Sequence, residues 1–308
     1  MARGIQTMGR ARVTMSELNS RIEELRQNAL AKVRAEEFDD ALVMYDEALT
    51  LATEEEVREL ITINKGHALI AAERTGPEVK ALPMILMRRR NPHHTFLSSY
   101  ALMYTHRLTS ETKRAIFYGQ IALEAANQAD QMYWRLAALN ELGIVYEIDS
   151  QFPKAIECLD QALACVDRDS SDTAAHSFSR VAIITNLGYN KLLVGETKEG
   201  LRLLHSVIDE ISTPHSKSDA FADLCYGYLD LEAYETARHY GDLALEFACE
   251  PRQVRNAHYL TGEAAYKAGD VESAEEHFGE LARFYPQFRH LKSLLFAIDL
   301  RSMINLKL

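Results

Sequence analysis

The stretch LNELGIVYEIDSQFPKAIECLDQALACV, residues 139–166, decides the fold of this chain. It places a small residue inside an apolar helical pattern, then a turn, then a second helical pattern that carries small residues. The residues that define it are Leu139, Leu142, Gly143, Tyr146, Ala155 and Ala162. One such pair of helices leaves an apolar face uncovered, so the stretch predicts a helical hairpin that must stack on others.

The same pattern recurs along the chain, which is the signature of a repeat array. Small residues at the start of the second helices mark the copies, and from Ala115 onward they follow one another in steps of 37 to 45 residues. They are Ala41, Ala115, Ala155, Gly200, Ala237 and Ala274. The gap between Ala41 and Ala115 is twice 37, so we expect a degenerate copy inside it, with Gly66 in the place of Gly143. Counting that copy gives seven hairpins.

This order of Leu-Gly, Tyr, Ala, Phe and Pro resembles the tetratricopeptide repeat family, over roughly residues 16–308. The resemblance implies an all-α, right-handed α-α superhelix, or solenoid, of about seven tetratricopeptide-like hairpins. We expect residues 1–15 to be a disordered basic tail or the remainder of an upstream start, and residues 288–304 to form a capping helix. The segment 75–96, with three prolines, should be irregular, and a second helix containing Pro83 should be kinked.

Helical periodicity and helix-breaking residues place the helices. The predicted pairs are 16–34 with 37–53, 55–74 with 77–89, 95–108 with 111–128, 131–149 with 152–166, 172–194 with 197–211, 217–231 with 234–248, and 251–268 with 271–284.

Charge and composition exclude several classes of function. The net charge of −11 argues against a nucleic-acid partner and is compatible with a basic one, although we favour the alternative in which Asp and Glu coat the convex face. No apolar run is long enough to cross a bilayer, and the first residues do not form a secretory signal. The four cysteines have no pairing or zinc-binding spacing, which favours reduced thiols and a cytoplasmic protein.

The resemblance implies a concave groove lined by the first helices of the hairpins. Positions close to the small residue of each first helix would then contact a peptide or protein partner. Asparagine amides would bond to peptide groups and tyrosine rings would cover side chains. The candidate groove residues are Asn64, Asn140, Asn186, Tyr189, Asp223, Tyr226 and Tyr259. In the equally weighted alternative, the tyrosines pack between hairpins and the asparagines bond to nearby backbone.

Three aspartates of one predicted first helix suggest what the partner carries. Asp219, Asp223 and Asp230 make the last part of the groove acidic, which favours a ligand with Lys or Arg. The family's carboxylate clamp is not expected, because Asn186 matches it but its basic partners are missing.

The run Arg88, Arg89 and Arg90 is a second candidate, as a patch for an anion or a partner. We favour the alternative, in which three arginines in a last helical turn complement the helix dipole.

No motif for catalysis, metal binding or a cofactor occurs in the sequence. We therefore expect no enzyme activity, no cofactor and no metal. The main hypothesis is a non-catalytic scaffold or adaptor that binds a peptide or an extended protein segment. The alternative hypothesis is a peptide-responsive sensor that changes superhelical shape to control a transcription factor or an enzyme. The apolar C-terminal helix should cap the last hairpin, with a homo-oligomer contact as the alternative.

Overall fold

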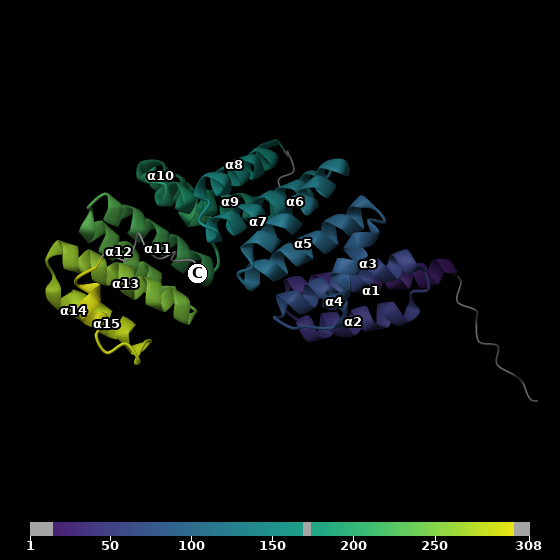
Figure 1. Cartoon of the computed structure of the whole chain (residues 1–308), viewed down its shortest axis with the longest axis horizontal. Helices are drawn as coiled ribbons and strands as arrows, with labels where there is room; N and C mark the ends of the chain where they lie inside the picture. Colours follow the sequence, from purple (N-terminus) through teal and green to yellow (C-terminus); the bar gives the residue numbers. More distant parts are fainter. Residues whose placement is uncertain (1–14, 169–173, 299–308) are drawn as a thin grey trace, which may run out of the picture. The chain divides into compact units, whose positions relative to one another are not determined.

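The computed structural model describes residues 15–168 and 174–298, and within these ranges every regular element is a helix (Figure 1). The chain divides into two compact units, Met1–Gln131 and Met132–Leu308, which we call the N-terminal and C-terminal units. The expected tail at residues 1–15 lies outside the described residues except for Met15, which begins the first helix. The expectation of one array over residues 16–308 stays a prediction.

The N-terminal unit contains three helical hairpins. In each, the second helix packs antiparallel to the first, and the next hairpin packs against it. Their apolar faces form two clusters, one centred on Tyr45 and one on Leu82. The helices are α1 (Met15–Arg34), α2 (Phe38–Leu51), α3 (Glu55–Ala71), α4 (Pro77–Arg88), α5 (Pro92–Leu108) and α6 (Thr112–Gln128).

The C-terminal unit contains four hairpins and a short last helix. Its first helices α7, α9, α11 and α13 contact one another in succession. The helices are α7 (Met132–Ile148), α8 (Phe152–Arg168), α9 (Ala174–Leu193), α10 (Thr197–Val207) with a 3-10 turn Ile208–Glu210, α11 (Pro214–Asp230), α12 (Tyr234–Glu246), α13 (Pro251–Ala268), α14 (Val271–Arg283) and α15 (Leu291–Leu295). All seven predicted pairs are present, with ends shifted by a few residues.

A constant internal spacing relates the seven hairpins. We take one residue of each first helix as its reference residue: Ala29, Gly66, Met103, Gly143, Gly188, Cys225 and Gly262. Twelve residues later, six hairpins have the predicted small residue at the start of the second helix, and it is buried in each. In the four hairpins whose reference residue is glycine, the side chain sixteen residues later faces it, as Leu159 faces Gly143. The predicted small-residue register is thus confirmed.

The turn inside each hairpin also lies at a constant distance in sequence from the reference residue. Seven residues after the reference residue, the backbone is left-handed, with φ between 56° and 88°. Glycine occupies this position in two hairpins and a residue with a side chain in five. The turn residues are Glu36, Glu73, Ser110, Ser150, Gly195, Glu232 and Gly269. A left-handed residue after a first helix ends that helix and lets the chain reverse.

The second hairpin departs from the pattern, as expected for the degenerate copy. Glu78 stands where the other hairpins have Ala or Gly, and its carboxylate lies 2.9 Å from the Lys65 ammonium. Both side chains are 13% exposed, so an ion pair replaces a small-residue contact between α3 and α4. Helix α4 continues through Pro83 from Pro77 to Arg88. The segment 75–96 therefore contains the whole of α4 and the start of α5, and it lies inside the N-terminal unit.

The last helix is shorter than predicted. The sequence predicts a helix over residues 288–304, whereas the described part contains only Leu291–Leu295, and residues 299–304 lie outside it. The prediction is wrong at residues 288–290, which form a turn after α14. Leu295 is buried and the Phe296 ring packs edge-on against Phe278, at 5.0 Å between centroids. These residues cover the end of the last hairpin, and a homo-oligomer contact here stays a prediction.

Candidate functional site

All seven candidate groove residues lie on first helices. Asn64 lies on α3 of the N-terminal unit, and the other six lie on α7, α9, α11 and α13 of the C-terminal unit. The structure therefore groups these six on four neighbouring helices of one unit. We describe this group by its amides, its rings and its carboxylates in turn.

The amides include acceptors that the protein leaves unused. Asn140 and Asn186 are half-buried. The Oδ1 atom of Asn140 on α7 is buried and has no hydrogen-bond partner. The same holds for the Oδ1 atom of Asn190, one turn after Asn186 on α9. A buried amide oxygen without a donor is costly, and such groups in native proteins call for an explanation such as an unseen ligand.

Asn190 is a residue that the sequence analysis missed. Its Nδ2 atom donates to Glu147 Oε2 at 2.7 Å and to the Asn186 carbonyl at 2.9 Å. The first bond links α9 to α7 and fixes the direction of the amide, so its oxygen points away from both acceptors. The signal in the sequence was an amide among apolar residues on the first helix, two positions after Gly188.

The tyrosines are buried. Tyr189 is fully buried, and its ring meets that of Tyr226 edge-on across α9 and α11, with centroids 6.4 Å apart. Tyr226 and Tyr259 belong to the apolar core of the C-terminal unit. This packing corresponds to the alternative in which the tyrosines pack between hairpins. A contact between them and a ligand stays a prediction.

Buried carboxylates lie on the same first helices. Glu147, Asp223 and Glu263 are 2–3% exposed, on α7, α11 and α13. Glu263 pairs with Lys267 at 3.1 Å, and Glu147 accepts the Asn190 bond. Asp223 was expected here. Glu147 and Glu263 were not among the candidates, because no other hairpin has an acidic residue at the equivalent position.

Asp219, expected to attract a basic ligand, is instead occupied within the unit. Its carboxylate accepts hydrogen bonds from Arg252 at 3.2 Å and from Gln253 at 3.1 Å.

In the N-terminal unit, Asn64 is 5% exposed, and its Nδ2 atom lacks a hydrogen-bond acceptor. A neighbouring network in this unit is centred on Glu59, which is also 5% exposed. Glu59 accepts hydrogen bonds from Arg88 and, at 2.8 Å, from Arg90. Burial raises the pKa of Glu59, but these bonds outweigh it and leave the pKa below its ordinary value.

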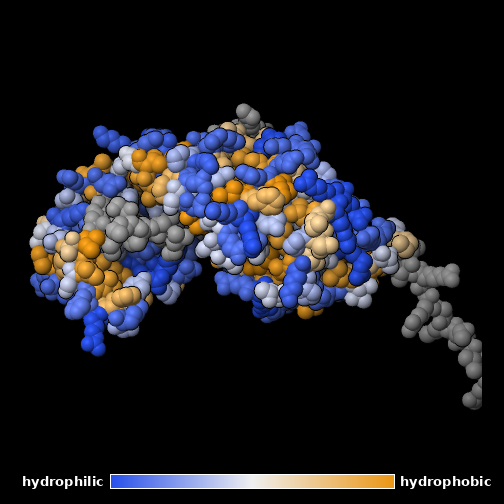
Figure 2. All heavy atoms as spheres, in the orientation of Figure 1, coloured by the Kyte–Doolittle hydropathy of each residue, from blue (hydrophilic) through white to orange (hydrophobic). Residues whose placement is uncertain are grey.

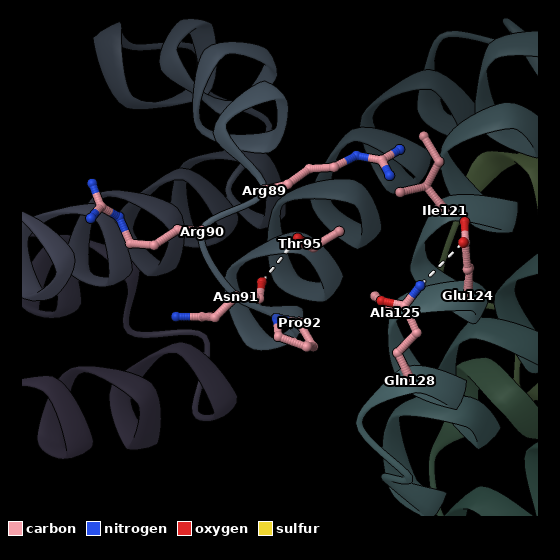
Figure 3. Close-up of a pocket in the computed structure, with 9 residues that line it drawn as sticks. All are labelled: Arg89, Arg90, Asn91, Pro92, Thr95, Ile121, Glu124, Ala125 and Gln128. Carbon is pink, nitrogen blue, oxygen red and sulfur yellow. Dashed lines mark hydrogen bonds between the residues drawn. The ribbon is translucent and has the colours of Figure 1, made fainter.

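The three consecutive arginines do not form one patch. Arg88 and Arg90 both pair with Glu55 and Glu59. Arg89 ends α4 with a left-handed backbone, φ 43°, and its side chain points the opposite way from that of Arg90 (Figure 3). It borders a cavity of about 160 Å³. Arg90 borders the same cavity, and binding of an anion or a partner by these arginines stays a prediction.

This architecture, helical hairpins in a constant register with small residues at their contacts, defines the tetratricopeptide-repeat-like fold. No family model matches the sequence, and the comparison with curated proteins found no match. Solved structures share the fold. The apo form of the quorum sensor NprR from B. thuringiensis has a TM-score of 0.71 and 14% identity, over 95% of this chain and 84% of that one.

The apo form of RapI has a TM-score of 0.67 and 12% identity, over 90% of this chain and 79% of that one. A Rap protein in complex with Competence and Sporulation Factor has a TM-score of 0.64 and 15% identity, over 92% of this chain and 78% of that one. At these identities the comparisons show the fold alone. In the part of the chain that the structure covers, no helix is long and apolar enough to cross a membrane.

Proposed function

We propose that this chain is a non-catalytic cytoplasmic protein that binds a peptide or an extended protein segment on the first helices of its C-terminal unit. The observation that carries the proposal is the pair of buried amide oxygens without donors, on Asn140 and Asn190 of the adjacent helices α7 and α9. Once the side chains that cover these two oxygens move aside, the N–H groups of an extended peptide would supply the missing donors.

The carboxylates indicate what the bound segment carries. Glu147 and Asp223 place negative charge on α7 and α11, whereas the charge of Glu263 on α13 is offset by Lys267. Burial strengthens the attraction between such groups and an incoming cation. We therefore expect the preferred segment to contain Lys or Arg.

The comparisons support binding of a peptide. One structure similar to this chain is a Rap protein complexed with Competence and Sporulation Factor. Another, with a TM-score of 0.64, is NprR in complex with its cognate peptide NprX.

Binding of an array of short synthetic peptides, followed by fluorescence anisotropy on the hits, tests this function. Asn140→Ala should weaken binding of Lys- or Arg-containing hits by about tenfold, because one hydrogen bond in a desolvated site is lost. Gln161→Ala is the matched control, since this exposed amide of α8 bonds only within its own helix, to Glu157. Equal binding by both variants, or no preference for basic peptides over acidic ones, would exclude this site.

A second candidate function is a peptide-responsive regulator, favoured by the likeness to a protein described as a quorum sensor. Small-angle scattering with and without a peptide hit separates the two functions. A regulator should change its scattering profile on binding, whereas an adaptor should keep it.

A further inference from the structure

The solvent face of α4 differs from that of the other second helices. Apolar and hydrophilic residues are mixed over the visible surface (Figure 2), so one exposed apolar side chain means little. The repeat register provides a stricter comparison. Twenty-one residues after the reference residue, α4 has Met87, which is 75% exposed. The other hairpins have at this position Thr50, Glu124, Ala164, Asp209, Glu246 and Arg283.

Two further residues extend this apolar face. Met84, three residues before Met87, is 59% exposed. Pro83 is also exposed, at a position where the other second helices have Asp46, Gln120, Asp160, His205, Asp242 and Gly279. A proline inside a helix has no N–H to donate and is tolerated here without ending α4. The three residues form a continuous apolar strip, because positions i, i+1 and i+4 share one side of a helix.

The strip lies in the most basic part of an acidic protein. Residues 79–90 contain Lys80 and three arginines and no acidic residue, in a chain of net charge −11. The carboxylates of Glu55 and Glu59 offset Arg88 and Arg90. Lys80 is exposed, and the Arg89 side chain points the opposite way from that of Arg90 (Figure 3). The strip therefore has basic groups at both ends.

Arg89 extends over a cavity at the end of α4. Figure 3 shows its guanidinium reaching toward Ile121 of α6, with Pro92 and Thr95 of α5 along the opposite wall. Glu124 borders the same cavity and accepts a hydrogen bond from Gln128 at 3.2 Å. A carboxylate from another molecule would meet Arg89 at the mouth of this cavity, whose lining also includes Arg90 and Ile121.

We propose that the α4 face, consisting of Pro83, Met84, Met87 and Arg89, docks an acidic amphipathic helix of a partner protein. Methionine side chains adapt their shape and are common where helices bind in this way. Acidic residues on the docked helix would pair with Arg89 and Lys80. This surface belongs to the N-terminal unit, and it binds independently of the peptide surface proposed for the C-terminal unit.

Two other occupants fit less well. A second copy of the chain meeting this face by two-fold symmetry would bring like basic charges together. A membrane surface requires one broad apolar side of a helix, whereas Leu82, Ile85 and Leu86 of α4 are buried in the core, and only a narrow strip remains.

The experiment uses the whole chain and three designed peptides of equal length. One is an amphipathic helix with Leu on one side and Glu on the other, one has Lys in place of Glu, and one has the acidic composition in scrambled order. Fluorescence anisotropy should show binding of the first peptide only. Met84→Ser with Met87→Ser, and separately Arg89→Glu, should each weaken it by about tenfold or more.

Phe117→Ser is the matched control, because Phe117 is an exposed apolar residue of α6 in the same unit, at 58% exposure. It should leave binding unchanged, and thermal melts should show that the methionine variant folds like the parent. Equal binding of the scrambled peptide, or of the basic one, overturns the proposal. It is also overturned if the methionine variant loses self-association in sedimentation, or loses binding to phosphatidylserine vesicles, while the acidic helix does not bind.

Discussion

Gly262 and Phe278 lie so close that a Cβ atom on residue 262 would stand 2.6 Å from the Phe278 ring. The two residues are sixteen apart and join the helices of the last hairpin. Gly143 with Leu159, at 2.8 Å, and Gly188 with Leu204, at 2.9 Å, repeat the relationship. The glycine is thus needed for close approach of two helices, and its cost in helix propensity is offset by that packing.

Gly262→Ala should destabilise the protein by about 1–3 kcal/mol, because the fully buried Phe278 ring has to move. Gly66→Ala is the opposite case, since its Cβ would meet Leu82 at 3.5 Å, an ordinary contact. That change should stabilise by up to about 1 kcal/mol through helix propensity. Urea denaturation of both variants measures whether each change raises or lowers the free energy of unfolding. Destabilisation of similar size at both positions would contradict the packing argument.

Glu232→Gly should stabilise the C-terminal unit by about 0.5–1 kcal/mol. Glu232 has φ 57°, a left-handed conformation that costs a residue with a side chain more than it costs glycine. Gly195→Ala tests the converse at the equivalent turn, where φ is 81° and a Cβ would touch nothing within 4 Å. It should destabilise through the backbone alone. Thermal denaturation should move in opposite directions for the two variants.

Glu59→Gln should destabilise the N-terminal unit by about 1–3 kcal/mol at neutral pH, because Arg88 and Arg90 lose a buried carboxylate. The lowered pKa of Glu59 also predicts a pH dependence. Its stabilising effect is present above the unfolded-state pKa of about 4.3 and is lost as pH falls through the lower folded-state pKa.

The pH dependence is checked by denaturation at several acidic pH values, and it should be weaker in Glu59→Gln than in the parent. The control is Glu56→Gln on the exposed side of α3, which should change stability by less than about 0.5 kcal/mol. Equal loss of stability in the two variants would show that burial of Glu59 is unimportant.

The last hairpin should weaken as the pH falls below neutral. His258 and His277 lie with their Nδ1 atoms 3.1 Å apart, which requires one ring to donate and the other to accept. Burial lowers the pKa of both, and it outweighs the nearby carboxylates of Glu276 and Asp242. For a histidine with a lowered folded-state pKa, stability is present above the unfolded value of about 6.5 and is lost as pH falls through the folded value.

Hydrogen exchange of α13 and α14 between neutral and mildly acidic pH measures this effect. His258→Gln with His277→Gln should remove most of the pH dependence. A change of the same size in the double variant would assign the effect to other groups.

Helix positions and the small-residue register could be predicted because they follow from local periodicity and from a small residue that recurs in six of the seven hairpins. The third hairpin departs from the small-residue pattern. Met103 occupies its reference position and Gly119 the position sixteen later, so the large and small residues are exchanged relative to Gly143 and Leu159. A pattern that searches for a small residue cannot detect the exchange, although the sum of the two volumes is similar.

The candidate site could be predicted only to the level of the helices. The repeat places Asn140, Asn186 and Asp223 on first helices, as found. The repeat pattern carries no information on which polar atoms already have hydrogen-bond partners within the protein. The Asn190–Glu147 bond joins residues 43 apart, and the separation of Arg89 from its neighbours depends on a single backbone dihedral.

Because the spacing from reference residue to turn is the same in all seven hairpins, differences in repeat length arise after the turn. The two longest steps are those from Met103 to Gly143 and from Gly143 to Gly188. Both include a second helix of 17 residues, α6 or α8, whereas α2 has 14. The end of the second helix is consequently the part of the repeat that tolerates added residues, and a reporter domain inserted between α6 and α7 would leave the spacing from reference residue to turn unchanged.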